Sequence, residues 1–327
     1  MTRRYQRMLA CAMSVVMAAM PVTAMAAGSA PEEELSGAVA EAILTLEVPA
    51  LQDTLLSEDS SMSQQPELES QELTTVTDPN AVTLVFNGQE LALDNYARLS
   101  GGVTCVPVRD FFEAMGCAVT WDVSVNKIRI TRGDGLSMEL QPGSRLARAN
   151  GRCWYMGSAC SYSSGVTMIP LRDAAKVFSG EVTWEKATKT AYVVGGELLE
   201  SGETFYDQED LLWIARIVRH ESGNQPLDGK VAVANVIINR MSSPAFPDTA
   251  EEVIYDNRNG VQFVKRSSKS ILKEPSEQCY LAAKLALEGY ETAPDCFYFA
   301  SNTVAKTCWA GRNRQVYAVF GGHTYFL

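Results

Sequence analysis

Residues 102–121 read GVTCVPVRDFFEAMGCAVTW, and residues 165–184, which begin 63 positions later, read GVTMIPLRDAAKVFSGEVTW. Nine of the 30 positions aligned from residue 102 onward are identical. The identities include a proline, the Arg-Asp pair that follows it, and the tryptophans Trp121 and Trp184. Self-similarity at a fixed offset indicates a duplicated structural unit.

Each copy has the pattern of a β-α-β-β unit. A short strand precedes the proline, the Arg-Asp pair opens a helix of two to three turns, and a strand ending at the tryptophan follows. The last strands are predicted at Lys127–Thr131 and Thr190–Val194, and Val82–Phe86 supplies an extra leading strand. The sequence therefore predicts a small α+β domain of two similar halves over residues 81–196.

The first copy of the repeat contains the motifs VPVRD, VTWD and KIRIT, with a predicted helix after the first. In this order the motifs resemble the copper amine oxidase N-terminal-like domain. The resemblance covers residues 82–196, a stretch without histidine, so the family name does not imply a copper site here. We interpret the matched Arg-Asp and Trp residues as helix-start and core features, and the domain as a stalk or wall-attachment module.

The first 26 residues have the pattern of a secretory signal peptide. Arg3, Arg4 and Arg7 precede the uncharged, largely apolar stretch Met8–Met20, and Ala24-Met25-Ala26 is a small-x-small cleavage site. The apolar stretch is shorter than the roughly 20 residues that span a bilayer. We expect an exported protein without a membrane anchor after cleavage, placed outside the cell, in the wall or in the spore cortex.

Residues 27–80 are expected to form a disordered acidic linker. From Gly28 to Asn80 there are 12 acidic residues, no Lys or Arg, and no aromatic residue. The net charge of −11 therefore belongs mainly to this segment, and residues 81–327 carry only −2. The folded part has no basic surface of the kind that binds nucleic acid.

Seven cysteines remain after the signal peptide is removed. An odd number in an exported protein allows disulfides with a free thiol left over, and it equally allows a set of small buried apolar residues. The chain has two histidines and no CxxC pair, so we expect neither a metal site nor another cofactor. The cysteines are Cys105, Cys117, Cys153, Cys160, Cys279, Cys296 and Cys308.

The segment Gly195–Glu203 is rich in Gly, Glu and Ser and is expected to be a hinge that separates the repeat from a second domain, residues 204–327. A helix is predicted directly after it. Asp207 suits the N-cap, apolar residues such as Ile214 and Val218 follow at helical spacing, and Glu221 lies on the same apolar face in the last turn.

A carboxyl group on an apolar helix face is poorly solvated, which favours its protonated form, and the negative end of the helix dipole acts in the same direction. Glu221 therefore has the setting of a general acid that protonates a glycosidic oxygen. Helical spacing alone leaves open a glutamate that simply points into water, because charged side chains are usually exposed.

The surrounding sequence resembles the SleB-like cell-wall hydrolase family, known for lysis of the spore cortex. The resemblance spans about residues 206–326 and implies a mostly helical, lysozyme-like domain that acts on peptidoglycan glycan strands, with Glu221 as the catalytic glutamate. The blocks are ARIVRHESGNQPLDGKVAVANVIINR (215–240), FPDTAEEVIY (246–255), VQF (261–263), FYF (297–299) and GH (322–323).

The sequence favours a lytic transglycosylase over a simple hydrolase. Ordinary glycosidases use two carboxylates, whereas here Glu221 alone stands in a strong motif and Asp228 and Asp256 lack an apolar setting. A lone glutamate can serve as acid and then as base while the muramic acid 6-hydroxyl closes a 1,6-anhydro ring. The alternatives are an inactive wall-binding protein, a hydrolytic muramidase or glucosaminidase, and an amidase.

Four further residues are candidates for substrate binding. Gln262 and Tyr298 can hydrogen-bond sugar groups, Phe263 can stack on a sugar ring, and His323 can support such a residue, although a packing role is as good an interpretation of each. Asn239 is expected to be a structural hydrogen-bonding residue, and Trp309 part of the core or of a groove wall.

Overall fold

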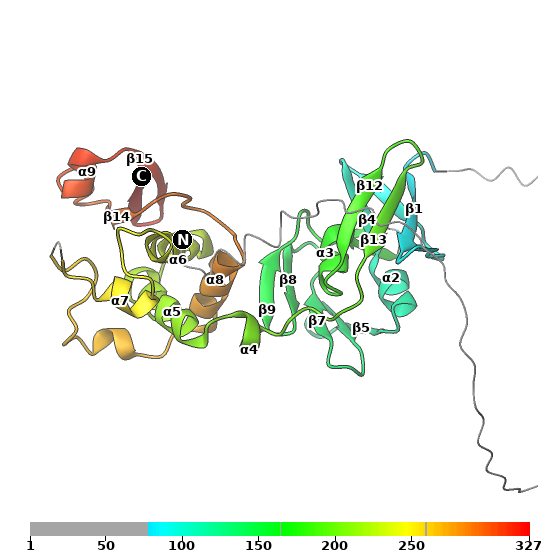
Figure 1. Cartoon of the computed structure of the whole chain (residues 1–327), viewed down its shortest axis with the longest axis horizontal. Coiled ribbons are helices and arrows are strands. Elements are labelled where there is room, and N and C mark those ends of the chain that lie inside the picture. Colours follow the sequence, from blue (N-terminus) through cyan, green and yellow to red (C-terminus); the bar gives the residue numbers. More distant parts are fainter. Residues whose placement is uncertain (1–77, 164, 259) are drawn as a thin grey trace, which may run out of the picture. The chain divides into compact units, whose positions relative to one another are not determined.

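The computed structural model describes residues 78–163, 165–258 and 260–327 (Figure 1). The predicted signal peptide and the linker up to residue 77 lie outside the described residues. Among the residues described, no helix combines the length and apolar character that crossing a bilayer requires.

The first described part contains the predicted β-α-β-β unit twice. The strands and helices are β1 (Ala81–Phe86), β2 (Gln89–Glu90), β3 (Ala97–Ser100), β4 (Val103–Pro107), α2 (Val108–Ala114), β5 (Ala118–Asp122), β6 (Lys127–Thr131), β7 (Ser137–Leu140), β8 (Leu146–Ala149), β9 (Arg152–Tyr155), β10 (Ser161–Ser163), β11 (Val166–Pro170), α3 (Leu171–Lys176), β12 (Glu181–Glu185) and β13 (Thr190–Val194). The copies are β4-α2-β5-β6 and β11-α3-β12-β13, so the duplicated α+β fold is confirmed, as is the leading strand.

The two copies meet along their first strands. β4 and β11 pair antiparallel, with Val106 opposite Ile169, its equivalent in the repeat. The last strands separate: β12 and β13 join β1 in the eight-stranded sheet, whereas β5 and β6 join β7, β8 and β9 in a five-stranded sheet. Both sheets contribute to one hydrophobic core, in which the rings of Phe111, Phe112 and Phe178 contact one another.

The core role predicted for the matched tryptophans is wrong, because Trp121 is 42% and Trp184 is 39% exposed. The aspartates of the repeated Arg-Asp pair do have a structural role, as predicted. Asp110 lies in the first turn of α2 and accepts hydrogen bonds from the backbone and side-chain nitrogens of Asn95, at 2.6 and 3.0 Å. Asp173 in α3 accepts in the same way from the Gly157 backbone N–H at 3.0 Å and from Trp154 Nε1 at 2.9 Å. Each aspartate therefore ties its helix to a neighbouring loop.

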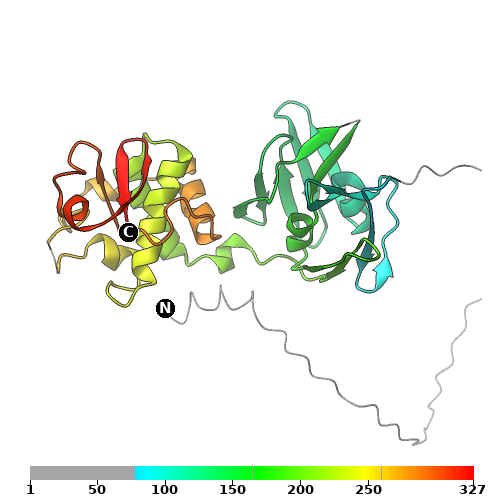
Figure 2. The same cartoon turned by 90° about the horizontal axis from the view of Figure 1, so that it is seen from above.

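The second described part is built on helices, with a small sheet beside them (Figure 2). The elements are α4 (Gly202–Phe205), α5 (Gln208–Ser222), α6 (Leu227–Met241), α7 (Ala250–Ile254), the 3-10 helix η1 (Ser270–Leu272), α8 (Glu277–Leu287), β14 (Tyr298–Ser301), α9 (Trp309–Asn313), β15 (Val316–Phe320) and β16 (His323–Phe326). α5, α6 and α8 pack against one another around a second core, and β14, β16 and β15 form an antiparallel sheet. The mostly helical expectation is confirmed, with this sheet as an addition.

The segment predicted as a hinge is packed against its surroundings. A Cβ added at Gly195 would lie 2.6 Å from Gly180 Cα, and one added at Gly202 would lie 2.6 Å from the Gly151 carbonyl oxygen. Leu199 between them is buried, and its N–H donates to the Val177 carbonyl at 2.9 Å. Backbone contacts of this kind hold the segment in place.

All seven cysteines of the described residues are free thiols, and all except Cys308 are buried. The sequence left open disulfides or small buried apolar cysteines, and the structure has the buried cysteines. Burial raises the pKa of the Cys160 thiol to about 11. Burial, with a smaller contribution from the charge of Asp295, also raises the pKa of the Cys296 thiol to about 11. These thiols therefore stay protonated at neutral pH.

Candidate active site

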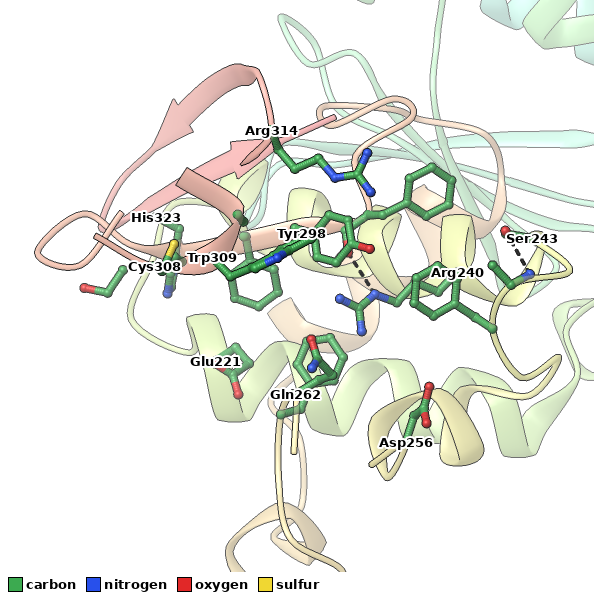
Figure 3. A pocket seen from close by; sticks show the side chains of 18 residues that line it. Glu221, Arg240, Ser243, Asp256, Gln262, Tyr298, Cys308, Trp309, Arg314 and His323 are labelled. Carbon is green, nitrogen blue, oxygen red and sulfur yellow. Dashed lines mark hydrogen bonds between the residues drawn. The ribbon is translucent and has the colours of Figure 1, made fainter. Parts of the chain in front are cut away.

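A cavity of about 950 Å³ opens between the ends of α5 and α6, the loop residues Asp256, Gln262 and Phe263, and the β14 sheet. Figure 3 shows Glu221 and Gln262 on one wall and Tyr298, Trp309 and His323 facing them. Its lining comprises Glu221, Arg240, Ser243, Ala245, Phe246, Asp256, Gln262, Phe263, Phe297, Tyr298, Phe299, Ala300, Ser301, Cys308, Trp309, Ala310, Arg314 and His323. All five residues singled out from the sequence therefore line one cavity.

Glu221 is delivered to this cavity by α5. Asp207 caps the helix, since its carboxylate accepts the backbone N–H groups of Glu209 and Asp210, and Ile214 and Val218 are fully buried on one face. Glu221 continues that face as the second-last residue of the helix, with 23% of its side chain exposed. Burial raises its pKa to about 7, so a large fraction of the carboxyl is protonated at neutral pH.

The neighbouring imidazole of His220 does not cancel the effect of burial on the pKa of Glu221. His220 Nε2 lies 3.9 Å from Glu221 Oε1. Burial, helped by the neighbouring Arg219 charge, lowers the pKa of His220 below its ordinary value. The imidazole is therefore mostly neutral near pH 7 and gives the carboxylate little stabilisation.

Asp256 is a second carboxyl group in the cavity, and it has the opposite setting. Its oxygens accept hydrogen bonds from Arg258 Nε at 3.0 Å and Nη2 at 2.9 Å, which outweigh burial and hold its pKa below the usual value. Asp228, the other candidate for a second carboxylate, does not line the cavity, and its carboxylate instead accepts from the Tyr290 hydroxyl at 3.3 Å.

Arg240 is a cavity residue that the sequence interpretation did not single out. It is 3% exposed, donates from Nε to the Phe297 carbonyl at 2.8 Å, and lies over the rings of Phe263 and Tyr298. Burial lowers its pKa to about 10, and Nη1 has no hydrogen-bond partner among the described residues. The available signal was an arginine in the last turn of a helix whose middle, residues 231–238, is apolar except for Asn235.

Tyr298 and Trp309 face Glu221 across the cavity (Figure 3). Phe263 packs on Phe299, Tyr298 packs on Trp309 with ring centres 5.3 Å apart, and Trp309 is 53% exposed. Trp309 is therefore a groove wall, one of the two roles expected for it. Gln262 donates to the Gly260 carbonyl at 3.1 Å, which fixes its amide at the rim.

His323 has a packing contact as well as its place in the cavity. Its ring stands edge-on to Phe299 at 5.3 Å, and its buried Nδ1 has no hydrogen-bond partner in the described part of the chain. Burial lowers its pKa, which keeps the ring neutral at pH 7. Asn239 is structural, as expected, because its amide donates to the Ala293 and Cys296 carbonyls.

The part of the chain that the structure describes contains no cluster of three or more His, Cys, Asp or Glu side chains that could hold a metal ion. The cavity instead combines one protonatable carboxyl, one ion-paired carboxylate, a buried guanidinium and an aromatic wall. Such a set can transfer a proton to a ligand that stacks on rings.

Two family models match the chain. Residues 85–193 match the copper amine oxidase N-terminal domain, and residues 224–326 match the cell wall hydrolase family. The second match begins just after Glu221, so the role of that residue is argued from its surroundings and from the pattern of its helix.

Curated relatives match over 120 residues, which are 37% of this chain. The spore cortex-lytic enzymes of Oceanobacillus iheyensis and Bacillus cereus are each 31% identical, with 42% and 45% of their own lengths covered. The chain thus spans less than half of these relatives.

The chain is also similar to a crystal structure of the catalytic domain of the Bacillus cereus SleB protein. The identity is 30%, the match covers 37% of this chain and 92% of that domain, and the TM-score is 0.34.

Proposed function

We propose that the protein is an exported enzyme that degrades peptidoglycan, because residues 224–326 match the cell wall hydrolase family and residues 85–193 match the copper amine oxidase N-terminal domain. Residues 204–327 are its catalytic domain, and residues 81–196 attach it to its substrate. Its relatives that are described as spore cortex-lytic enzymes support this substrate class, with the cortex or the cell wall as the place of action.

The observation that carries the proposal is the state of Glu221. Burial raises the pKa of Glu221 to about 7 in a cavity lined by aromatic rings. At neutral pH its carboxyl group therefore holds a proton that it can donate to a glycosidic oxygen. Tyr298 and Gln262 hold sugar hydroxyl or N-acetyl groups, and Phe263 and His323 complete the wall that positions the ring.

We propose that the reaction is a lytic transglycosylation between N-acetylmuramic acid and N-acetylglucosamine. Glu221 gives its proton to the bridging oxygen as the bond from that oxygen to the anomeric carbon breaks. The 6-hydroxyl of the muramic acid then attacks that carbon and returns its proton to Glu221, which closes a 1,6-anhydro ring. No water is consumed, so no water-activating carboxylate is needed.

Hydrolysis is the second candidate function, and Asp256 is the observation that favours it. Its carboxylate is ionised and lines the same cavity as Glu221. Two carboxyls whose pKa values are pushed apart are the pattern of an acid and base pair. The ion pair with Arg258 argues against it, because that guanidinium occupies both carboxylate oxygens.

Mass spectrometry of the products from purified peptidoglycan tests both. We expect anhydromuropeptides from the parent protein, none from Glu221→Gln, and unchanged products from Glu209→Gln, a control on the exposed first turn of the same helix. Asp256→Asn should retain the anhydro products.

Reducing ends together with loss of activity in Asp256→Asn would establish hydrolysis. Freed stem peptides would indicate an amidase, and no release at all would indicate a wall-binding protein.

A further inference from the structure

The repeat domain has a cavity of its own, about 660 Å³ in volume, where the two copies of the repeat meet. One side comes from β5, β6 and the start of α2, and the other comes from β10 and β11. The volume lies in the range of about 300–1,000 Å³ that small-ligand sites occupy.

Two aromatic side chains line this groove with their rings open to solvent. Trp121 is 42% exposed and Tyr162 is 63% exposed, and among the described residues neither makes a ring–ring or cation–π contact. Trp154 in the same domain differs, because it is 5% exposed, lies under the Lys176 ammonium, and donates to Asp173. Ring faces left in water beside a concavity are typical of binding sites.

The charges of the groove are already paired. Arg109 forms a 2.8 Å ion pair with Glu113 and donates to the Val119 carbonyl at 3.2 Å. Asp110 is occupied by the nitrogens of Asn95. The Asn126 amide and the Tyr162 hydroxyl line the groove without a hydrogen bond to the described residues, so the polar groups left for a ligand are neutral.

Open rings together with neutral hydrogen-bonding groups suit a polyhydroxylated, uncharged ligand. A sugar ring presents C–H groups on its faces and hydroxyl or amide groups around its edge. An anionic stem peptide would instead need unpaired positive charge, and the lining has its one guanidinium occupied.

We propose that this groove binds the glycan strand of peptidoglycan, with Trp121 and Tyr162 as the stacking platforms. The proposal deepens the proposed function and rests on it for the choice of glycan. A strand held by the repeat domain is presented to the catalytic domain at a high local concentration, so binding gains from two linked sites on one polymer.

Co-sedimentation with insoluble peptidoglycan tests the groove in the full chain carrying Glu221→Gln, which leaves the polymer intact. We expect Trp121→Ala to weaken binding about tenfold, which corresponds to about 1.4 kcal/mol. Trp184→Ala is the matched control: it is the equivalent residue of the second copy, it is 39% exposed, and it does not line the groove. That variant should bind as tightly as the parent.

Tyr162→Ala serves as a second variant if Trp121→Ala fails to fold, because Tyr162 is mostly exposed on the short strand β10. Soluble glycan strands stripped of peptide should compete for the parent, and free stem peptides should not. Unchanged binding in both variants would overturn the proposal, as would competition by peptides alone or equal weakening by Trp184→Ala.

The two proposals can fail separately. If the parent releases no product but its binding depends on Trp121 and is blocked by glycan, the groove is correct and the catalytic proposal is wrong. If anhydromuropeptides appear while Trp121→Ala binds normally, the catalytic proposal holds and the groove does not bind glycan.

Discussion

Burial alone does not decide the state of a glutamate in this chain; its partners do. The Glu288 side chain, directly after α8, is 3% exposed, and hydrogen bonds and charges from Arg152 and Lys176 overcome the effect of burial and hold its pKa below the usual value. The Glu221 side chain is more exposed, at 23%, yet burial raises its pKa, because its ion-pair contact among the described residues is His220, an imidazole whose own pKa is lowered. Glu221, and not the ion-paired Glu288, is therefore the glutamate suited to donate a proton.

This difference predicts the pH dependence of catalysis. Glu221 must be protonated to act as an acid, so kcat/KM should be constant below its pKa of about 7 and fall about tenfold for each pH unit above it. Initial rates of product release at constant ionic strength, between about pH 5 and 9, measure this limb.

His220 provides the control for that profile, because it is the other titratable group beside the cavity carboxyl, 3.9 Å away. His220→Gln should keep the same limb, since the pKa of His220 lies below its ordinary value and not near 7. A limb that disappears in His220→Gln, or one centred near the ordinary glutamate pKa, would contradict the assignment to Glu221.

At the residue scale, sequence patterns identified Glu221 but not Arg240. The helical spacing of Ile214 and Val218 is local, and it places Glu221 on a buried face without knowledge of the rest of the fold. The environment of Arg240 is made by Phe246, Phe263 and Tyr298, which approach only when loops and β14 fold over the end of α6. Such a contact has no signature in a single stretch of sequence.

At the scale of elements, the repeat predicted which strands and helices form but not how they pair. Each β-α-β-β unit follows from local alternation and from proline and Arg-Asp signals. The sheet to which a hairpin belongs depends on the neighbours available: β5–β6 precedes three further strands that extend its sheet, whereas β12–β13 is added to β1, more than 100 residues earlier. Two similar halves therefore enter different sheets.

The helix that carries Glu221 gives a prediction at this scale. Asp207 satisfies two N–H groups at the start of α5, at 3.1 and 3.2 Å. Asp207→Ala should lower the free energy of unfolding by about 1 kcal/mol. Asp207→Asn should lose much less, because asparagine is an equally good cap. Thermal melting followed by circular dichroism measures both variants.

The same variants separate stability from catalysis. Asp207 lies at the opposite end of α5 from Glu221, so product release at 25 °C should be unchanged in both. If Asp207→Ala melts like the parent, the cap is not contributing. A loss of activity in a variant that remains folded would mean that the cap also positions Glu221.

At the scale of the whole molecule, the described residues belong to one compact unit although they contain two large hydrophobic cores and a third, small cluster. Glu288 on α8 accepts from Arg152 on β9 at 2.6 Å, from Lys176 at 2.9 Å, and from the Tyr206 hydroxyl at 3.0 Å. The composition of residues 195–203 predicted a hinge between these parts. It could not predict the ion pair between Arg152 and Glu288, because residues 136 positions apart leave no local pattern in the sequence.

Glu288→Gln should therefore be costly. Removing one partner of a buried ion pair leaves the other charge unpaired, which costs about 3–5 kcal/mol. Glu113→Gln is the control, since its pair with Arg109 is exposed and pairs of that kind contribute about 1 kcal/mol or less. Calorimetry should show a large fall in the melting temperature for the first variant and little change for the second.

The pH dependence identifies the cause of that fall. The pKa of Glu288 is lower in the folded chain than in the unfolded chain, so its contribution is complete above the unfolded value and is lost as pH falls through the folded value. The parent and Glu288→Gln should thus differ most near neutral pH and converge in acid. A difference that persists unchanged into acid would mean that the glutamine disturbs packing, and the ion pair with Arg152 would then not be what couples the two cores.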